Sequence, residues 1–277
     1  MEPETSRSRL VAKSAPLRVS AIIVVGDSAP SLELCLRGVL GEPWVDELIL
    51  VDAGAPKELA SSLRALQADR RDVKFIQQKK KPIPLHVAAR NIGAERAMGK
   101  WLLFLDADVV LQRGAVERLV KAGRLARSPW IVGGGLSDPN GRKRQVRGRT
   151  MIGRRPAPVE LVDEAFMLIP RAEFHALGGF DEAYELHGET ADLCRRAKDS
   201  GGAVWHQPVA EAVQFANSRA ASPISDQIQR ARAKARFERK YARTDLARAL
   251  VALWAPLLIA AGAVKGAFMV PFRAWKK

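Results

Sequence analysis

The chain has 277 residues, of which 47% are hydrophobic and 27% are charged, and this balance excludes a disordered or collagen-like protein. The formal net charge of +15 favours a polyanionic partner, namely a nucleic acid, an anionic membrane surface or a phosphorylated substrate. From residue 219 onward 13 Lys and Arg residues stand against 3 Asp and Glu residues, so most of the excess positive charge lies near the C-terminus.

The first 17 residues are polar and lack the apolar core of a secretory signal. We therefore expect a flexible N-terminus over residues 1–17 and a cytoplasmic protein. The two cysteines, Cys35 and Cys194, have no CxxC partner, and we interpret them as reduced, buried, small hydrophobic residues.

Residues 19 to 105 alternate between short apolar runs and amphipathic stretches. The apolar runs predict strands at residues 19–25, 47–51, 73–76 and 101–105. Helical spacing of apolar residues predicts helices at residues 32–40, 56–68 and 86–98. Strands that are apolar on both faces and alternate with helices indicate an α/β fold with a mostly parallel, Rossmann-like sheet covered by helices on each side.

The pattern changes after residue 108. Further strands are predicted at residues 131–136 and 161–170, and further helices at residues 113–127, 171–177 and 189–200. Residues 141–158 contain seven Lys and Arg residues and no acid, which is typical of a loop. Together these elements predict one domain over residues 18–218.

The C-terminal segment, residues 219–277, combines a basic helix with an apolar run. The helix is predicted from about residue 225 to residue 250, and the apolar run covers the 16 residues 249–264. A helix of that length would reach about 24 Å, less than the roughly 30 Å hydrocarbon core of a bilayer. We therefore expect a membrane-associated extension that enters an anionic membrane surface.

Four aspartates follow the predicted strands: Asp27, Asp52, Asp106 and Asp108. Each could be a turn or helix-capping residue, but the carboxyl ends of parallel strands form the edge where such sheets bind ligands. Asp106 and Asp108 form an Asp-x-Asp pair, and Mn²⁺ or Mg²⁺ is commonly shared between one or two carboxylates and a diphosphate. The pair therefore predicts a divalent metal site.

Several short motifs occur in a fixed order along the chain. They are VSAIIVV (19–25), LILVD (48–52), AARNIG (88–93), FLDAD (104–108), LGGFDE (177–182) and DLCRR (192–196). This ordered set resembles the family 2 glycosyltransferases, which have the GT-A nucleotide-sugar fold. The resemblance covers about residues 19–208.

The resemblance implies roles for the strand-end residues. Asp52 would contact the nucleotide base, Arg90 would lie near the nucleotide, and Asp27 would lie beside the nucleotide pocket. Asp106 and Asp108 would hold Mn²⁺ or Mg²⁺ on the diphosphate of the donor, for which a UDP-sugar is favoured. Relatives often have Tyr where this chain has Gly26, so one stacking contact is missing.

The general base departs from the family pattern. Relatives usually have Glu-Asp-x-Asp-Leu, whereas this chain reads Glu-Thr-Ala-Asp-Leu over residues 189–193, and Thr190 cannot act as a base. Glu189 is the first candidate and Asp192 the second. Alternatively, both are first-turn acids that favour the helix dipole, with Asp192 paired to Arg196. Gln214 stands where many relatives have a histidine, and His206 is weighed as an ordinary strand histidine.

These implications predict an inverting glycosyltransferase that transfers a single sugar to a saccharide acceptor. The sequence QIQRA at 227–231 lacks the Trp of the QxxRW motif of processive synthases. The acceptor would be a lipid-linked saccharide for cell-surface polysaccharide or glycolipid synthesis at the cytoplasmic face of the cell membrane. The alternative is a degenerate, non-catalytic GT-A module that binds nucleotide-sugar or membrane. Because only 6% of residues are aromatic, no stacking array accompanies the basic residues, which argues against a nucleic-acid partner.

Overall fold

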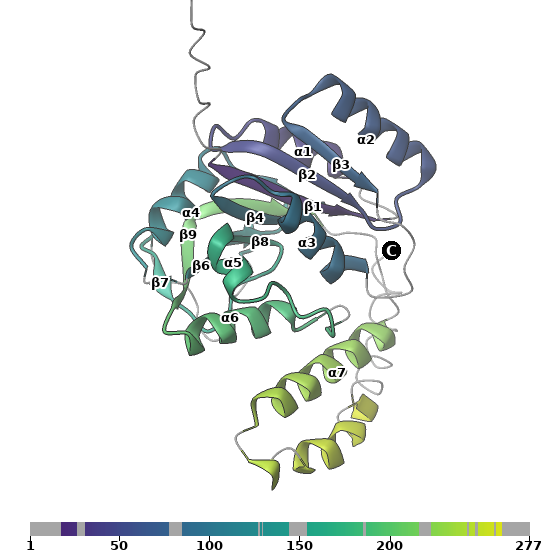
Figure 1. Cartoon of the computed structure of the whole chain (residues 1–277), viewed down its shortest axis with the longest axis vertical. Helices are drawn as coiled ribbons and strands as arrows, with labels where there is room; N and C mark the ends of the chain where they lie inside the picture. Colours follow the sequence, from purple (N-terminus) through teal and green to yellow (C-terminus); the bar gives the residue numbers. More distant parts are fainter. Residues whose placement is uncertain are drawn as a thin grey trace, which may run out of the picture.

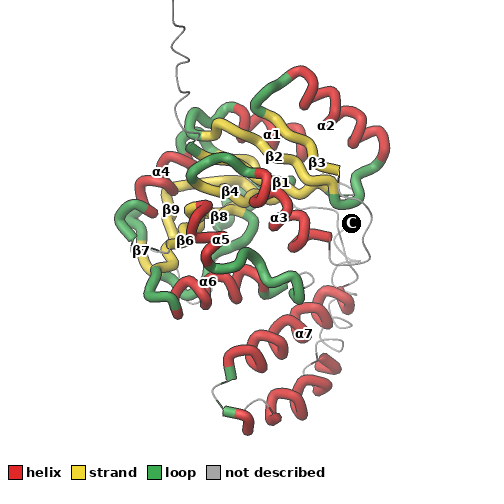
Figure 2. Tube along the Cα trace, viewed as in Figure 1, coloured by secondary structure: helices red, strands yellow, loops and turns green. Residues whose placement is uncertain are grey.

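A nine-stranded sheet with helices on both faces forms the centre of the computed structural model (Figure 1, Figure 2). The strands are β1 (Val19–Val25), β2 (Val45–Asp52), β3 (Val73–Gln77), β4 (Trp101–Asp106), β5 (Val109–Leu111), β6 (Trp130–Ser137), β7 (Ala157–Pro158), β8 (Phe166–Pro170) and β9 (Ala203–Gln214). The helices are α1 (Leu32–Leu40), α2 (Lys57–Asp69), α3 (Leu85–Arg96), α4 (Ala115–Gly123), α5 (Arg171–Ala176), α6 (Glu189–Asp199) and α7 (Pro223–Tyr241). The structure describes residues 18–26, 31–77, 85–126, 128, 130–143, 154–184, 187–215, 223–242, 244–246, 249–257 and 259–261.

The sheet is parallel in its first half and mixed in its second. Strands β3, β2, β1 and β4 are adjacent and parallel, as the α/β alternation of the sequence predicts. Strand β8 then lies antiparallel between β4 and β6, and β9 pairs parallel to β6 and antiparallel to β5. Because β8 runs in the opposite direction, its first residues lie at the same edge as the carboxyl end of β4.

Two apolar cores, one on each face, hold the helices against the sheet. One core contains buried apolar residues of α1, α2 and α4, and the other contains buried apolar residues of α3, α5 and α6. Alternate residues of β1 divide between them, since Ile23 belongs to the first core and Ile22 to the second. Helix α3 crosses β1 closely at Gly93, where a Cβ atom would lie 2.5 Å from Cγ2 of Ile22. This contact places Arg90, one turn earlier in α3, over the carboxyl end of the sheet.

The predicted elements are confirmed with four corrections. The helix predicted over residues 113–127 spans only Ala115–Gly123, and β7 lies at the end of the predicted loop 141–158. The strand expected from residue 161 begins only at Phe166, because residues 163–165 form a turn in which Oδ1 of Asp163 accepts a hydrogen bond from the amide of Ala165 at 3.1 Å. The basic helix ends at Tyr241 and not at residue 250. Thr244 and Asp245 follow, two residue types that favour the start of a new helix.

The C-terminal segment continues with helical residues at 249–257 and 259–261, drawn beside α7 in Figure 1. In the described ranges, no helix combines the length and the apolarity needed to cross a bilayer. Residues 1–17, predicted to be flexible, lie outside the described part of the chain, as do residues 144–153 of the predicted basic loop. Both cysteines are free and buried, as expected.

Candidate active site

Two of the predicted site aspartates lie at the carboxyl ends of neighbouring strands. In the sheet register, Val25 of β1 stands opposite Asp52 of β2, and Val24 stands opposite Asp106 of β4. The end of β1 therefore lies between two aspartates, at the edge where open α/β sheets bind ligands. Asp27, also expected at this edge, lies outside the described residues.

Asp52 closes the turn that follows β2. Its Oδ1 atom accepts hydrogen bonds from the backbone amides of Gly54 at 3.0 Å and Ala55 at 2.8 Å. Asp52 therefore has the turn role that was one of its two predicted roles, the other being contact with a nucleotide base. The residue is buried at the sheet edge, so its position suits both roles.

Arg90 joins the first acid of the Asp-x-Asp pair to the first candidate base. Its guanidinium is buried, and Nη2 donates to Oδ1 of Asp106 at 2.9 Å while Nη1 donates to Oε1 of Glu189 at 2.8 Å. Burial acts to lower the pKa of Arg90, but the carboxylates of Asp106, Glu189 and Glu164 outweigh it and raise that pKa. One cation thus brings together side chains from α3, β4 and α6.

Glu189 is the first residue of α6 and is 2% exposed. Its second oxygen, Oε2, is buried and has no hydrogen-bond partner in the part of the chain that the structure describes. Thr190, which stands in the usual place of the family base, is also buried, and its hydroxyl has no partner among those same residues. Helix α6 therefore carries a buried carboxylate with one oxygen held by Arg90 and one oxygen that no described residue contacts by a hydrogen bond.

Glu164 lies near the site acids, although it was not predicted as a site residue. Burial, together with the nearby carboxylates of Asp163 and Glu189, raises the pKa of Glu164 to about 7, although Arg90 acts in the opposite direction. Glu164 belongs to the turn before β8, and Ala165 in that turn accepts a hydrogen bond from the amide of Asp106 at 3.1 Å. In the sequence, Glu164 is recognisable only as an acid that stands just before a buried apolar run. Glu164 reaches the site because β8 runs antiparallel to β4.

Asn91, the neighbour of Arg90 in the predicted motif, holds the turn formed by the LGGFDE motif. Its Nδ2 atom donates to the backbone oxygen of Phe180 at 2.9 Å and to Oε1 of Glu182 at 3.0 Å, and its Oδ1 atom accepts from the amide of Phe180 at 3.0 Å. Gly179 in this turn has a φ of +70°, a conformation that favours glycine. The two adjacent motif residues thus have different roles, one at the acids and one at the turn.

Asp108 lies in the turn after β4 and contacts the end of β9. Nε2 of Gln214 donates to the two carboxylate oxygens of Asp108 at 3.2 and 3.4 Å. The residue that replaces the usual histidine of the family therefore lies beside the second acid of the pair. His206, earlier on β9, is buried opposite Gly133, and burial lowers its pKa to about 4, as expected for a neutral histidine inside the protein.

Asp192, the second candidate base, contacts a different set of side chains. It is fully buried, and Nε of Arg196 donates to its Oδ2 atom at 2.7 Å, as the alternative reading predicted. Lys240 and Tyr241 of α7 contact its Oδ1 atom at 2.6 and 2.8 Å. The structure thus separates the two candidate bases, since Glu189 meets Arg90 and Asp192 meets α7.

The Asp-x-Asp pair has the chemistry of a site for a hard divalent cation. Over the described ranges, no three or more His, Cys, Asp and Glu side chains are grouped so that they could hold a metal ion. Asp106 and Asp108 supply carboxylate oxygens, which Mn²⁺ and Mg²⁺ prefer, and the side chain of Asp106 is 34% exposed. Two carboxylates suffice when a bound diphosphate completes the ligand set, so these residues fit a cation that binds together with a diphosphate.

The strand order and the carboxylate edge define the GT-A class of glycosyltransferase folds, and solved structures share this fold. GalNAc-T7 with UDP, GalNAc and Mn²⁺ matches with a TM-score of 0.64 and 17% identity, over 79% of this chain and 48% of that one. The mannosyltransferase PcManGT from Pyrobaculum calidifontis, in complex with GDP-Man and Mn²⁺, matches with a TM-score of 0.58 and 18% identity, over 94% and 80%. S. aureus TarS matches with a TM-score of 0.56 and 14% identity, over 91% and 43%.

The family follows from the sequence match. The model of the family described as "Glycosyl transferase family 2" matches residues 20–158, and the chain belongs to this family. The chain is 30% identical over 136 residues to pre-mycofactocin glycosyltransferase of Mycobacterium tuberculosis, in both strain CDC 1551 / Oshkosh and strain ATCC 25618 / H37Rv. The match covers 44% of this chain and 28% of the length of that relative.

Proposed function

We propose that this protein is an inverting glycosyltransferase that transfers one sugar from a nucleotide-sugar donor to an acceptor hydroxyl. The observation that carries the proposal is the bridge that Arg90 makes between Asp106 and Glu189. It brings Asp106, which we propose for the donor site, and the buried carboxylate of Glu189 together at the edge of the sheet where open α/β sheets bind ligands. Membership of glycosyl transferase family 2 supports the same reaction class.

In the proposed reaction Glu189 is the general base. Arg90 orients one of its oxygens, and we propose that the other oxygen, Oε2, which is buried and has no partner among the described residues, accepts the proton of the acceptor hydroxyl once the acceptor is bound. The acceptor oxygen bonds to the anomeric carbon on the side opposite the nucleoside diphosphate, which leaves with the bonding electron pair. The configuration at that carbon is therefore inverted.

We propose that Asp106 and Asp108 hold Mn²⁺ or Mg²⁺ together with the donor diphosphate, and that Asp52, Arg90 and Asp27 line the nucleotide site. When bound, the cation supplies Lewis-acid stabilisation of the charge on the departing diphosphate. Two of the structural neighbours were solved with Mn²⁺, one with UDP and one with GDP-Man. A UDP-sugar is the proposed donor, and a GDP-sugar is the comparison to make.

A panel of UDP- and GDP-sugars, each with Mn²⁺, Mg²⁺ or EDTA, tests this function. We expect release of nucleoside diphosphate from one donor class, which EDTA abolishes and a saccharide acceptor accelerates. If calorimetry shows donor binding while no donor is turned over, the non-catalytic GT-A module is the correct reading. Neither binding nor turnover would contradict both.

We further propose that the C-terminal segment attaches the protein to an anionic membrane surface at the cytoplasmic face, where the acceptor is a lipid-linked saccharide. Five large apolar side chains are exposed there at positions i, i+4, i+7, i+8 and i+11, the pattern expected for one face of a helix. They are Leu246, Leu250, Leu253, Trp254 and Leu257, between 47% and 71% exposed. Exposed basic residues of the adjoining α7, such as Arg232 and Arg239, would meet anionic lipid headgroups.

Flotation with lipid vesicles tests the membrane proposal. We expect the protein to float with vesicles that contain anionic lipid and to be released by salt, because the basic residues act through screened charges. The triple variant Leu253→Ser, Trp254→Ser and Leu257→Ser is expected to lose most of this binding. The control is Met98→Ser with Leu125→Ser, two exposed apolar residues outside the C-terminal segment. Equal flotation of the two variants would refute the assignment.

A further inference from the structure

Helix α7 contacts the base-bearing helix α6 through the buried carboxylate of Asp192. Nζ of Lys240 lies 2.6 Å from Oδ1 of Asp192, and the hydroxyl of Tyr241 donates to the same atom at 2.8 Å. Arg196 occupies the other oxygen. A buried carboxylate without such partners would be strongly destabilised, so these contacts hold α7 firmly against α6.

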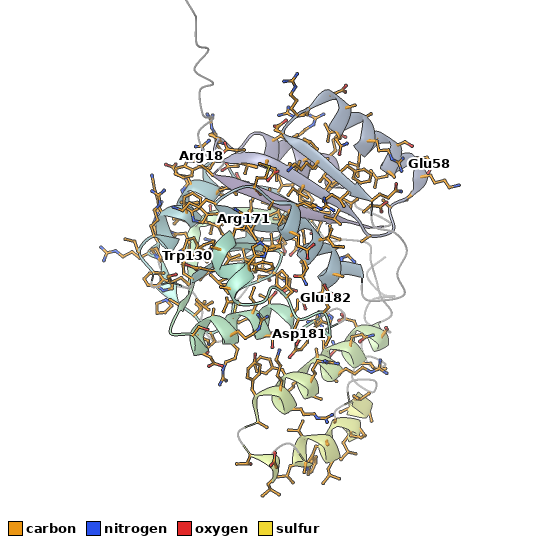
Figure 3. All side chains as sticks on the ribbon, viewed as in Figure 1. Arg18, Glu58, Trp130, Arg171, Asp181 and Glu182 are labelled. Atoms are coloured by element: carbon orange, nitrogen blue, oxygen red, sulfur yellow. The ribbon has the colours of Figure 1, made fainter. Side chains whose placement is uncertain are left out.

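Lys240 also reaches the turn formed by the LGGFDE motif. Its Nζ atom lies 2.7 Å from Oδ2 of Asp181, which Figure 3 labels where the α/β domain meets α7. Asn91 holds the same turn through Phe180, and Asn91 is the neighbour of Arg90. One lysine of α7 therefore contacts both the first turn of α6, which carries Glu189, and the turn that Asn91 holds.

Residues 226–233 of α7 pack against the residues directly before Glu189. Nε2 of His187 and Oδ1 of Asp226 in α7 are 2.9 Å apart. Gly188 has a φ of +98°, and a Cβ atom there would lie 2.8 Å from the ring of Tyr184 and 3.3 Å from Cβ of Ala233 in α7. The chain that leads into Glu189 is thus packed between Tyr184 and α7.

We infer that α7 is a positioning element for the general base, and that Lys240 and Tyr241 are its positioning residues. By holding Asp192, they fix the first turn of α6 and keep Oε1 of Glu189 at Nη1 of Arg90. Displacing a reacting group by about 1 Å can cost a hundredfold in rate, so a modest shift of this turn is enough to lower kcat. The inference rests on the proposed role of Glu189 and adds a C-terminal helix to the catalytic machinery.

Steady-state kinetics and hydrogen exchange on the full chain test this inference together. The variants are Lys240→Met, Tyr241→Phe and the conservative Lys240→Arg. The control is Lys121→Met, an exposed lysine of α4 that pairs with Glu117 at 2.8 Å. We expect Lys240→Met and Tyr241→Phe to lower kcat by about 10- to 100-fold with the donor KM within about twofold. Exchange over residues 187–193 should become faster in both, Lys240→Arg should restore most of the kcat, and the control should match the unaltered protein.

Two results would overturn the inference. If exchange over residues 187–193 is unchanged in Tyr241→Phe, α7 does not hold this turn. If exchange is faster but kcat is unchanged, α7 packs against α6 without positioning the base. Tyr241→Phe decides the question if Lys240→Met fails to fold, because it removes only one hydroxyl. Hydrogen exchange does not depend on turnover. If the unaltered protein is inactive, the proposed function is wrong, and the exchange result alone still decides whether α7 holds this turn.

Discussion

Replacing Glu189 by glutamine is expected to lower kcat by about a hundred- to ten-thousandfold, the range for loss of a general base. The amide oxygen can still accept the hydrogen bond from Arg90, so the fold and the donor KM should be retained. Rates of sugar transfer with saturating donor and acceptor measure the effect, and far-ultraviolet circular dichroism checks folding.

The matched control is Asp199→Asn, which changes an exposed acid near the end of the same helix, where Asp199 pairs with Arg195 at 2.8 Å. It should leave kcat unchanged. A kcat for Glu189→Gln within about twofold of the unaltered protein would remove Glu189 from the mechanism.

Replacing Asp106 or Asp108 by asparagine is expected to abolish the stimulation of donor turnover by Mn²⁺ or Mg²⁺. A divalent cation contributes several kcal/mol to stabilising a departing diphosphate, so turnover should fall by about a hundredfold or more. Either amide keeps an oxygen that can accept from Arg90 or Gln214, which limits the structural effect.

Manganese binding in the presence of a nucleoside diphosphate gives a second readout, since the signal of free Mn²⁺ in electron paramagnetic resonance falls on binding. Both variants should bind Mn²⁺ more weakly, and Asp199→Asn should again match the unaltered protein. Undiminished, metal-stimulated turnover by a folded Asp108→Asn variant would refute the metal assignment.

The first half of the fold could be predicted from the sequence because its signals are local. Strands β1, β2 and β4 each contain a continuous apolar run, and β1 was predicted with the bounds that the structure has. Helices between them follow from the spacing of residues that pack on one face. Asp52 and Asp106, which end β2 and β4, could be placed at one edge because parallel strands align their carboxyl ends.

The remaining features depend on contacts between distant residues. The antiparallel insertion of β8 brings Glu164 to the site, and no periodicity before β8 reveals its direction. Arg90 and Glu189 are 99 residues apart in the sequence. Both residues could therefore be predicted as site residues, but their contact could not. Likewise, the first-turn acids of α6 look equivalent in the sequence, although Glu189 faces Arg90 and Asp192 faces α7.

The short distance along the chain between Tyr241 and Leu246 limits how the protein can sit on a surface. Tyr241 is fixed to α6, and Leu246 begins the row of exposed apolar side chains five residues later. Five residues reach at most about 17 Å even when fully extended. If the C-terminal segment binds lipid as proposed, a layer that holds Leu246 lies within that reach of Tyr241, and such an arrangement would suit an acceptor hydroxyl that is presented close to the layer.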